Sequence, residues 1–151
     1  MLYFVMEPLE RIALPLASKD DEMEIIAVSD LNRFNEVDYD VRSGLISERL
    51  KLPMERYLPK YDFKPVVYLD AQKQEQLAFW KFRPTFYGDY QAEYRSDGIV
   101  SRILFPNNRA PFVFTARSPK GVRSLVVRLA VAESILRRCI LGVKFTRVSE
   151  H

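Results

Sequence analysis

Few residues in this chain have the types and spacing that catalysis requires. His151 is the only histidine and Cys139 the only cysteine. A Ser-His-Asp triad, a Cys-His pair or a zinc site needs a well-placed imidazole or several thiolates, and no phosphate-binding glycine-rich motif occurs in the sequence. A carboxylate pair is the remaining chemistry, with Asp62, Asp70 and Asp89 as candidates, but solvated loop acids explain these residues more simply. We therefore expect no enzyme activity, no catalytic residue, no cofactor and no metal site.

An aromatic segment at 79–94, FWKFRPTFYGDYQAEY, is the most unusual local feature. Its rings alternate with Lys81 and Arg83, so they could fill a sheet core, form a protein interface or stack on single-stranded nucleic acid. The alternation favours the core for at least half of the rings, whereas Pro84 and Gly88 interrupt the strand pattern and place other rings on a loop. Tyr, Trp and Arg dominate the hot spots of protein interfaces. We therefore predict a partner-binding surface formed by Trp80, Arg83, Tyr87, Tyr90 and Tyr94.

Charge is distributed unevenly along the chain, although the formal net charge is only +3. Up to Asp40, ten acidic residues stand against three basic ones, and after Val100 ten basic residues stand against two acidic ones. Either the two ends lie against each other with complementary charges, or the molecule has an acidic and a basic face that steer charged partners. We favour the first alternative.

The elements that must position these residues are organised around the stretch 124–148, which reads as strand, helix, glycine stop and strand. One helical face is predicted to be buried, because its apolar residues recur at helical spacing; these are Ala132, Ile135, Leu136, Cys139 and Ile140. Gly142 is predicted to end the helix with a positive φ, which costs glycine nothing. Val143–Val148 follows as a strand. Arg137 and Arg138 are predicted to be solvated at the helix end.

A second strand-helix-strand unit is predicted over 43–70, and we expect both units to share one sheet. Ser47 is a suitable helix N-cap. Pro53 lacks an N–H and clashes with the preceding turn, so we predict a first turn at 47–50 and a restart at Pro53 that runs to about Leu58. Further strands are predicted at 2–6, 11–14, 24–28, 66–69, 77–82, 99–105 and 112–116. Turns are predicted at 97–98, 106–111 and 118–121.

Length and composition place the chain among ordinary globular proteins. A chain of 151 residues suits one domain. No apolar run reaches the roughly 18 residues of a transmembrane helix, the start lacks the basic segment of a secretory signal, and a single cysteine fits a reducing cytosol. We therefore expect one cytoplasmic α+β domain over 1–151, with a mixed β-sheet, two main helices in strand-helix-strand units, and no membrane partner.

A family resemblance rests on three segments: LYFVMEP, then GLISERL with YLPKYDFKPVVYLD, and ESILRRCILGVKFTRV. These resemble small bacterial proteins described as immunity proteins of polymorphic toxin systems, or as a domain of unknown function. The matching positions are 45–49 and 142–145, whereas Arg128 departs from a pattern that favours a Ser or Asp helix cap. The resemblance implies inhibition by binding, in which the protein occludes a cognate toxin of the same cell, and it brings no catalytic residues.

Two functions from different classes remain open. The first is a cytoplasmic immunity or interaction protein that binds and neutralises a protein toxin through a charged and aromatic surface. The second is a basic nucleic-acid-associated domain that uses the C-terminal arginines, and it is less favoured because no RNA-recognition signature occurs. Salt-dependent retention on DNA or RNA would support the second, and a toxin-like neighbouring gene would support the first.

Overall fold

The computed structural model describes residues 2–18, 20, 22–106 and 110–149 and shows the α+β fold that the sequence predicts. The N-terminal part contains β1 (Tyr3–Pro8), β2 (Glu24–Ala27), the short 3-10 helix η1 (Asn32–Phe34), β3 (Tyr39–Asp40), β4 (Leu45–Ser47), α1 (Glu48–Tyr57), β5 (Lys64–Asp70) and β6 (Glu75–Lys81). The remaining elements are β7 (Gln91–Tyr94), β8 (Val100–Leu104), β9 (Val113–Arg117), β10 (Arg123–Arg128), α2 (Leu129–Arg137) and β11 (Val143–Val148).

The two strand-helix-strand units lie in separate sheets, so the expectation of one shared sheet is wrong. One sheet has the order β11-β1-β10-β9 and the other β2-β5-β6-β4-β3, while β7 and β8 form a third, two-stranded sheet. In each large sheet a helix connects two strands that flank a third: β10 and β11 both pair antiparallel with β1, and β4 and β5 both pair antiparallel with β6. The central strand lies outside the strand-helix-strand unit in both sheets: it is β1 in one and β6 in the other. Each unit therefore adds its two strands to a different central strand.

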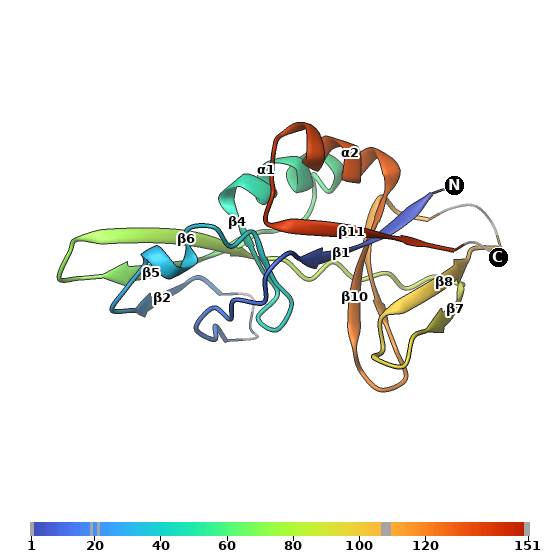
Figure 1. Cartoon of the computed structure of the whole chain (residues 1–151), viewed down its shortest axis with the longest axis horizontal. Helices are drawn as coiled ribbons and strands as arrows, with labels where there is room; N and C mark the ends of the chain where they lie inside the picture. The colour runs from blue at the N-terminus through green and yellow to red at the C-terminus, as the bar shows by residue number, and fades with distance from the viewer. Residues whose placement is uncertain (1, 19, 21, 107–109, 150–151) are drawn as a thin grey trace.

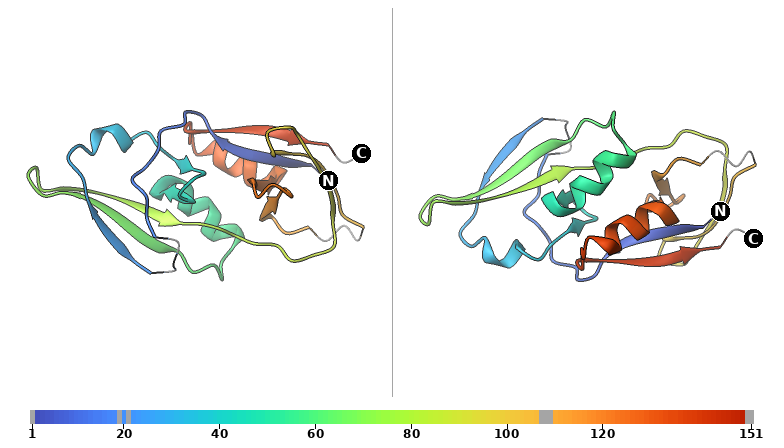
Figure 2. Two further views of the ribbon diagram at one scale, coloured as in Figure 1. Left: turned by 90° about the horizontal axis from the view of Figure 1, so that it is seen from below. Right: turned by 90° about the horizontal axis from the view of Figure 1, so that it is seen from above.

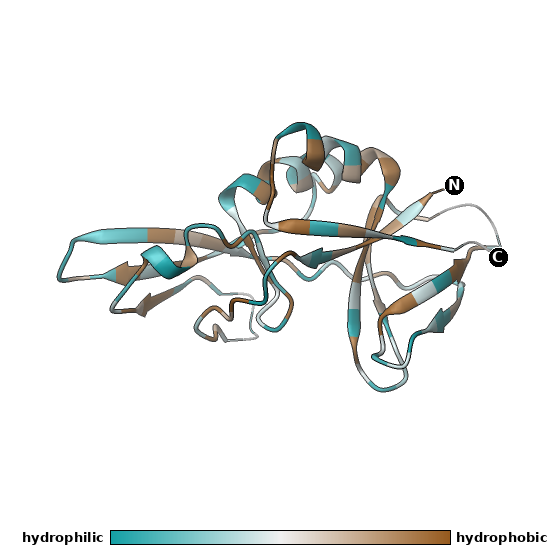
Figure 3. Cartoon of the chain, in the orientation of Figure 1, coloured by the Kyte–Doolittle hydropathy of each residue, from teal (hydrophilic) through white to brown (hydrophobic). Residues whose placement is uncertain are grey.

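The two helices lie side by side and join the two sheets (Figures 1 and 2). A hydrophobic cluster beneath them draws on both units, with Leu50 and Met54 from α1 and Val131 and Ile135 from α2 all fully buried. Apolar burial of this kind supplies most of the favourable free energy of folding. The far end of the β5–β6 hairpin, by contrast, is hydrophilic (Figure 3). No helix in the described ranges is long and apolar enough to cross a membrane.

Helix α1 is continuous, so the predicted break at Pro53 is wrong. Ser47 caps it as predicted, because its hydroxyl accepts a hydrogen bond from the Leu50 N–H at 3.2 Å. An internal proline costs about 3 kcal/mol, whereas burial of one Leu or Met side chain stabilises by about 1.5–3 kcal/mol. The helix buries both Leu50 and Met54 on the turns around Pro53. Tertiary burial therefore outweighs the local penalty of the proline.

Helix α2 ends earlier than predicted, and two residues of its predicted buried face are exposed. Ala132, Ile135 and Ile140 are buried as predicted, but Leu136 and Cys139 are exposed. The chain leaves the helix through Cys139, whose φ of 55° is left-handed. The Cys139 N–H donates to the Leu136 carbonyl and the Ile140 N–H to the Ile135 carbonyl. This is a Schellman ending with cysteine in the position that glycine usually takes, so the prediction placed the stop three residues late.

Gly142 is required for a different reason from the predicted positive φ. The described glycines with positive φ are Gly44, Gly98 and Gly121, and Gly142 is not among them. A Cβ built on Gly142 would lie 2.3 Å from Oδ2 of Asp38, and the Gly142 N–H donates to the same oxygen at 3.0 Å. Gly142 therefore allows a close approach between the α2–β11 connection and the buried carboxylate of Asp38.

The remaining element predictions divide between confirmed strands and one that is wrong. The strands expected near 2–6, 24–28, 66–69, 77–82, 99–105, 112–116 and 143–148 are present as β1, β2, β5, β6, β8, β9 and β11. The segment 11–14 is not a strand, because the Leu14 N–H donates to the Asp40 carboxylate at 3.2 Å instead of to a neighbouring strand. The turn at 106–111 falls partly, and His151 wholly, outside the described residues.

Candidate partner-binding surface

The segment from Phe82 to Tyr90 connects β6 to β7, and its first residues are held against both neighbouring elements. The Phe82 N–H donates to the Gly44 carbonyl at 2.8 Å, and the Phe82 ring is buried. The Arg83 backbone N–H donates to the Tyr61 hydroxyl at 2.8 Å, and its guanidinium donates to the Ser43 carbonyl at 2.9 Å. The start of this connection is therefore fixed relative to the β3–β4 turn and the segment after α1.

The second half of the connection is held by an aromatic cluster of the other large sheet. Phe86 stacks on Tyr90 with ring centroids 5.8 Å apart, and both rings also contact Phe105 and Phe114. Gly88 makes this arrangement possible, because a Cβ at that position would lie 2.2 Å from the Phe86 ring. Aromatic pairs of this kind stabilise by about 0.5–1.5 kcal/mol beyond the area they bury. The rings on either side of Tyr87 are thus fixed in place.

Tyr87 itself is 94% exposed, the highest value among the large hydrophobic side chains that are described. Its neighbours Phe86 and Tyr90 are partly buried in the aromatic cluster. The structure therefore presents one tyrosine ring to solvent from a segment whose flanking side chains are packed. The packed neighbours hold the backbone at Tyr87, so binding a partner has to order only the tyrosine side chain.

A groove of about 510 Å³ borders the same connection. It lies between the end of α1 and the residues before β9, and its lining combines aromatic, proline and aliphatic side chains with a few polar ones: Tyr57, Leu58, Pro59, Lys60, Tyr61, Arg83, Pro84, Thr85, Phe86, Pro111 and Val113. Concave apolar surfaces flanked by aromatic and arginine residues are typical of interface cores. Sequence reasoning missed the contribution of 57–61 and Pro111, and the only signal was their aromatic and proline content.

The five predicted binding residues do not form one cluster. Arg83 lines the groove, and Tyr87, four residues further along the same connection, is exposed to solvent. Tyr90 is part of the aromatic cluster. Trp80 lies on β6 against α1, where its Nε1–H donates to Glu48 at 2.5 Å and the Lys51 ammonium lies 4.0 Å from its ring centroid.

Tyr94 lies on β7, and its hydroxyl donates to the Arg117 carbonyl at 2.9 Å. Burial raises the pKa of this phenol, and nearby Tyr90 raises it further. The contacts of Trp80 and Tyr94 lie within the fold, so Tyr87, which is exposed, is the predicted residue best placed to meet a partner, with Arg83 lining the groove.

The three candidate catalytic carboxylates are not brought together. Asp62 precedes β5 and Asp70 is its last residue, and a strand of seven residues spans roughly 20 Å. Asp70 is buried, and its Oδ1 accepts hydrogen bonds from the Gln72 and Lys73 backbone N–H groups. Asp89 is exposed on the β6–β7 connection. Within the described ranges, no three His, Cys, Asp or Glu side chains are grouped as metal ligands.

The acidic residues of the N-terminal region form most of their ion pairs with basic residues that lie outside the basic C-terminal region. Lys81 contacts Asp20 at 3.3 Å and Glu24 at 2.7 Å, and Asp38 contacts Arg49 at 3.0 Å. Hydrogen bonds from Lys81 and from the Ser18 backbone lower the pKa of Glu24. Among the ion pairs of the described residues, Glu7–Lys144 at 3.9 Å joins the two ends of the chain. The favoured expectation of complementary ends therefore holds at that pair, while most C-terminal arginines face solvent.

Comparison with known proteins adds no relative. No protein-family model matches the chain, and no curated protein sequence matches it.

Proposed function

We propose that this protein acts by binding another protein through the Phe82–Tyr90 connection and the adjoining groove, as an immunity protein that neutralises a cognate bacterial toxin in the cytoplasm. The observation that supports this best is Tyr87, which is 94% exposed between two rings that are packed into the fold. The toxin as partner rests on the family resemblance of the sequence, and the groove and loop support the binding mode.

The chemistry of this surface suits a protein partner. Tyrosine and arginine are enriched among residues that dominate interface energies, and they act most strongly next to a groove that excludes water. Arg83 supplies a cation at the edge of the groove, while Pro84 and Phe86 supply apolar area. In this mechanism the protein inhibits by occupying the working surface of the toxin, and it needs no reactive group of its own.

The test is a binding titration against the protein encoded by the neighbouring gene. Tyr87→Ala should weaken the complex by about 1–2 kcal/mol, or about 5- to 30-fold in Kd, and leave the folded state unchanged. Leu141→Ala is the matched control, because Leu141 is also strongly exposed, at 74%, but lies on the α2–β11 connection. It should bind like the wild type.

Two results would contradict the proposal at different levels. If the wild type does not bind the neighbouring product but binds labelled single-stranded DNA or RNA with a steep salt dependence, the nucleic-acid function replaces it. If the wild type binds the protein and both variants bind equally well, the function stands and the assigned surface is wrong.

A further inference from the structure

A second and larger cavity, of about 730 Å³, lies between the two large sheets and meets the loop proposed to bind a partner protein at Arg83. It is lined by residues of β1, β3, β9, β10 and β11 and of the connections beside them, including Arg83 of the β6–β7 connection. Its volume falls within the roughly 300–1,000 Å³ that small-molecule sites occupy. Apolar side chains form part of its lining: Ile12, Ile99 and Val122 are half-buried, and Val41 is exposed.

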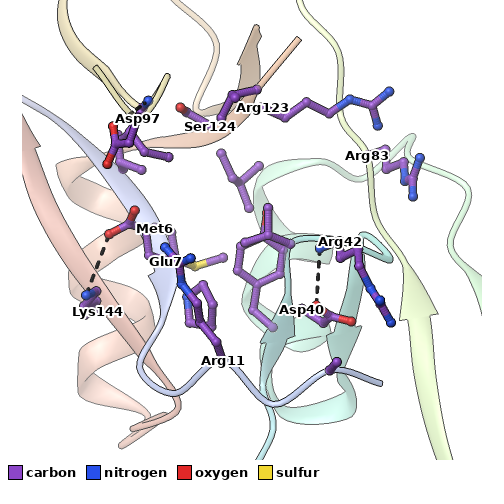
Figure 4. Close-up of a pocket in the computed structure, with 18 of the residues that line it drawn as sticks. Met6, Glu7, Arg11, Asp40, Arg42, Arg83, Asp97, Arg123, Ser124 and Lys144 are labelled. Atoms are coloured by element: carbon purple, nitrogen blue, oxygen red, sulfur yellow. Dashed lines mark hydrogen bonds and ion pairs between the residues drawn. The ribbon is translucent and has the colours of Figure 1, made fainter. Parts of the chain in front are cut away.

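Positive charge exceeds negative charge in this cavity. Six cationic and four acidic side chains line it, which leaves an excess of two positive charges. Figure 4 shows Arg42, Arg83 and Arg123 along one side and the Glu7–Lys144 pair on the opposite side. Arg83 and Arg123 therefore lie across the cavity from the Glu7–Lys144 ion pair.

Among the described residues, neither Arg83 nor Arg123 forms an ion pair with an acid of this cavity. Asp40 accepts hydrogen bonds from the Leu14 N–H, the Ser43 hydroxyl and the Arg42 backbone N–H, so its carboxylate is committed to the fold. Asp97 pairs with Arg95. Arg123 is exposed and forms no ion pair with any residue that the structure describes.

Tyr39 lines the cavity together with the charged residues Asp40, Arg83 and Arg123. Its side chain is buried and lines the cavity, and burial raises the pKa of its phenol, with Asp40 raising it further and Arg83 and Arg123 opposing the shift. The hydroxyl is therefore neutral at physiological pH and can both donate and accept a hydrogen bond. Both guanidinium groups act on this phenol, although Arg83 comes from the β6–β7 connection and Arg123 from the start of β10.

We propose that this cavity binds a small amphipathic anion, whose carboxylate or phosphate group is held by Arg83 and Arg123 and whose apolar part rests on Ile12, Val41 and Val122. Guanidinium groups bind such oxyanions through charge-assisted hydrogen bonds. The apolar lining provides area that an inorganic ion would not cover. The cavity shares Arg83 with the protein-binding groove, whereas Arg123 belongs to the cavity alone, and the proposal does not depend on a toxin partner.

The test uses the fluorescent sulfonate 8-anilinonaphthalene-1-sulfonate as the anionic probe and N-phenyl-1-naphthylamine as its uncharged counterpart, both with the folded full chain. The sulfonate should bind saturably at one site, and its binding should shift the NMR amide signals of Tyr39 and Leu125 but not that of Tyr87. Arg123→Gln should weaken sulfonate binding about tenfold, since hydrogen bonds to charged groups contribute about 1.5–3 kcal/mol. It should change binding of the uncharged probe less than twofold.

Arg137→Gln is the matched control, because it removes the same charge from an exposed position on α2. It should leave binding of both probes within twofold of the wild type. The proposal is overturned if the sulfonate does not saturate one site. It is also overturned if the two arginine variants respond alike, or if Arg123→Gln weakens both probes equally, since the site would then select apolar area and not charge.

Discussion

Replacing Gly142 by alanine should disrupt the contact between the α2–β11 connection and Asp38. Asp38 is 2% exposed and accepts hydrogen bonds from the Ser47 hydroxyl at 2.6 Å, the Arg49 Nε–H at 3.0 Å and the Gly142 N–H at 3.0 Å. All three nearest atoms to a Cβ at position 142 belong to Asp38, the closest being Oδ2 at 2.3 Å. The added methyl group would therefore displace the carboxylate from its donors.

The magnitude follows from the hydrogen bonds that are lost. A hydrogen bond to a charged group contributes about 1.5–3 kcal/mol, so Gly142→Ala should destabilise by at least that amount. Asp38→Ala removes the acceptor from all three donors and should cost about 3–5 kcal/mol, because the Ser47 donor is buried and the Gly142 N–H is partly buried. In the double variant the alanine at 142 no longer meets the carboxylate, so the double variant should be about as stable as Asp38→Ala alone.

The assay is urea unfolding followed by the fluorescence of Trp80, the only tryptophan. The double-mutant cycle should give a coupling free energy of about 1.5–3 kcal/mol. Asp89→Ala, which removes an exposed carboxylate, is the control and should change the unfolding free energy by less than about 0.5 kcal/mol. Additive effects of the two substitutions would refute the reasoning, because they would show that Gly142 does not act through Asp38.

Three further outcomes can be measured on the same scale. Ile135→Ala should cost about 2–5 kcal/mol because the side chain is fully buried, whereas Leu136→Ala, at 56% exposure, should cost less than about 1 kcal/mol; equal costs in urea unfolding would show the helix face is misassigned. Cys139→Gly should stabilise by up to about 1 kcal/mol, because glycine has no steric penalty at a φ of 55°, and a clear loss of stability would contradict the left-handed ending. Since the pKa of Glu24 is lowered from its ordinary value of 4.5, its ionised form stabilises the fold above that pH and the contribution is lost as the pH falls below it. Thermal unfolding of the wild type and Glu24→Gln should therefore differ at pH 7 and converge as the solution is acidified, and a constant difference would exclude this role.

The sequence by itself determined most of the local structure. The alternating and continuous apolar runs predicted β1, β5, β6, β8, β9 and β11, and the Ser47 hydroxyl was identified as the cap of α1. These features depend on side-chain periodicity and on hydrogen bonds between residues a few positions apart, so a short stretch of sequence contains what is needed. The aromatic content of 79–94 likewise pointed to rings in the core and on a loop, and Phe82 and Tyr87 show the two outcomes.

Only the tertiary structure decided how those elements combine. Pro53 stays inside a helix because distant residues bury its neighbours, and the strands that complete each sheet come from other parts of the chain. Gly142 is needed because Asp38, 104 positions away, approaches its backbone. The groove beside Arg83 and the cationic cavity at Arg123 likewise bring together residues that are far apart in the sequence. Such contacts depend on three-dimensional proximity and not on sequence spacing, and a local pattern therefore contains no signal for them.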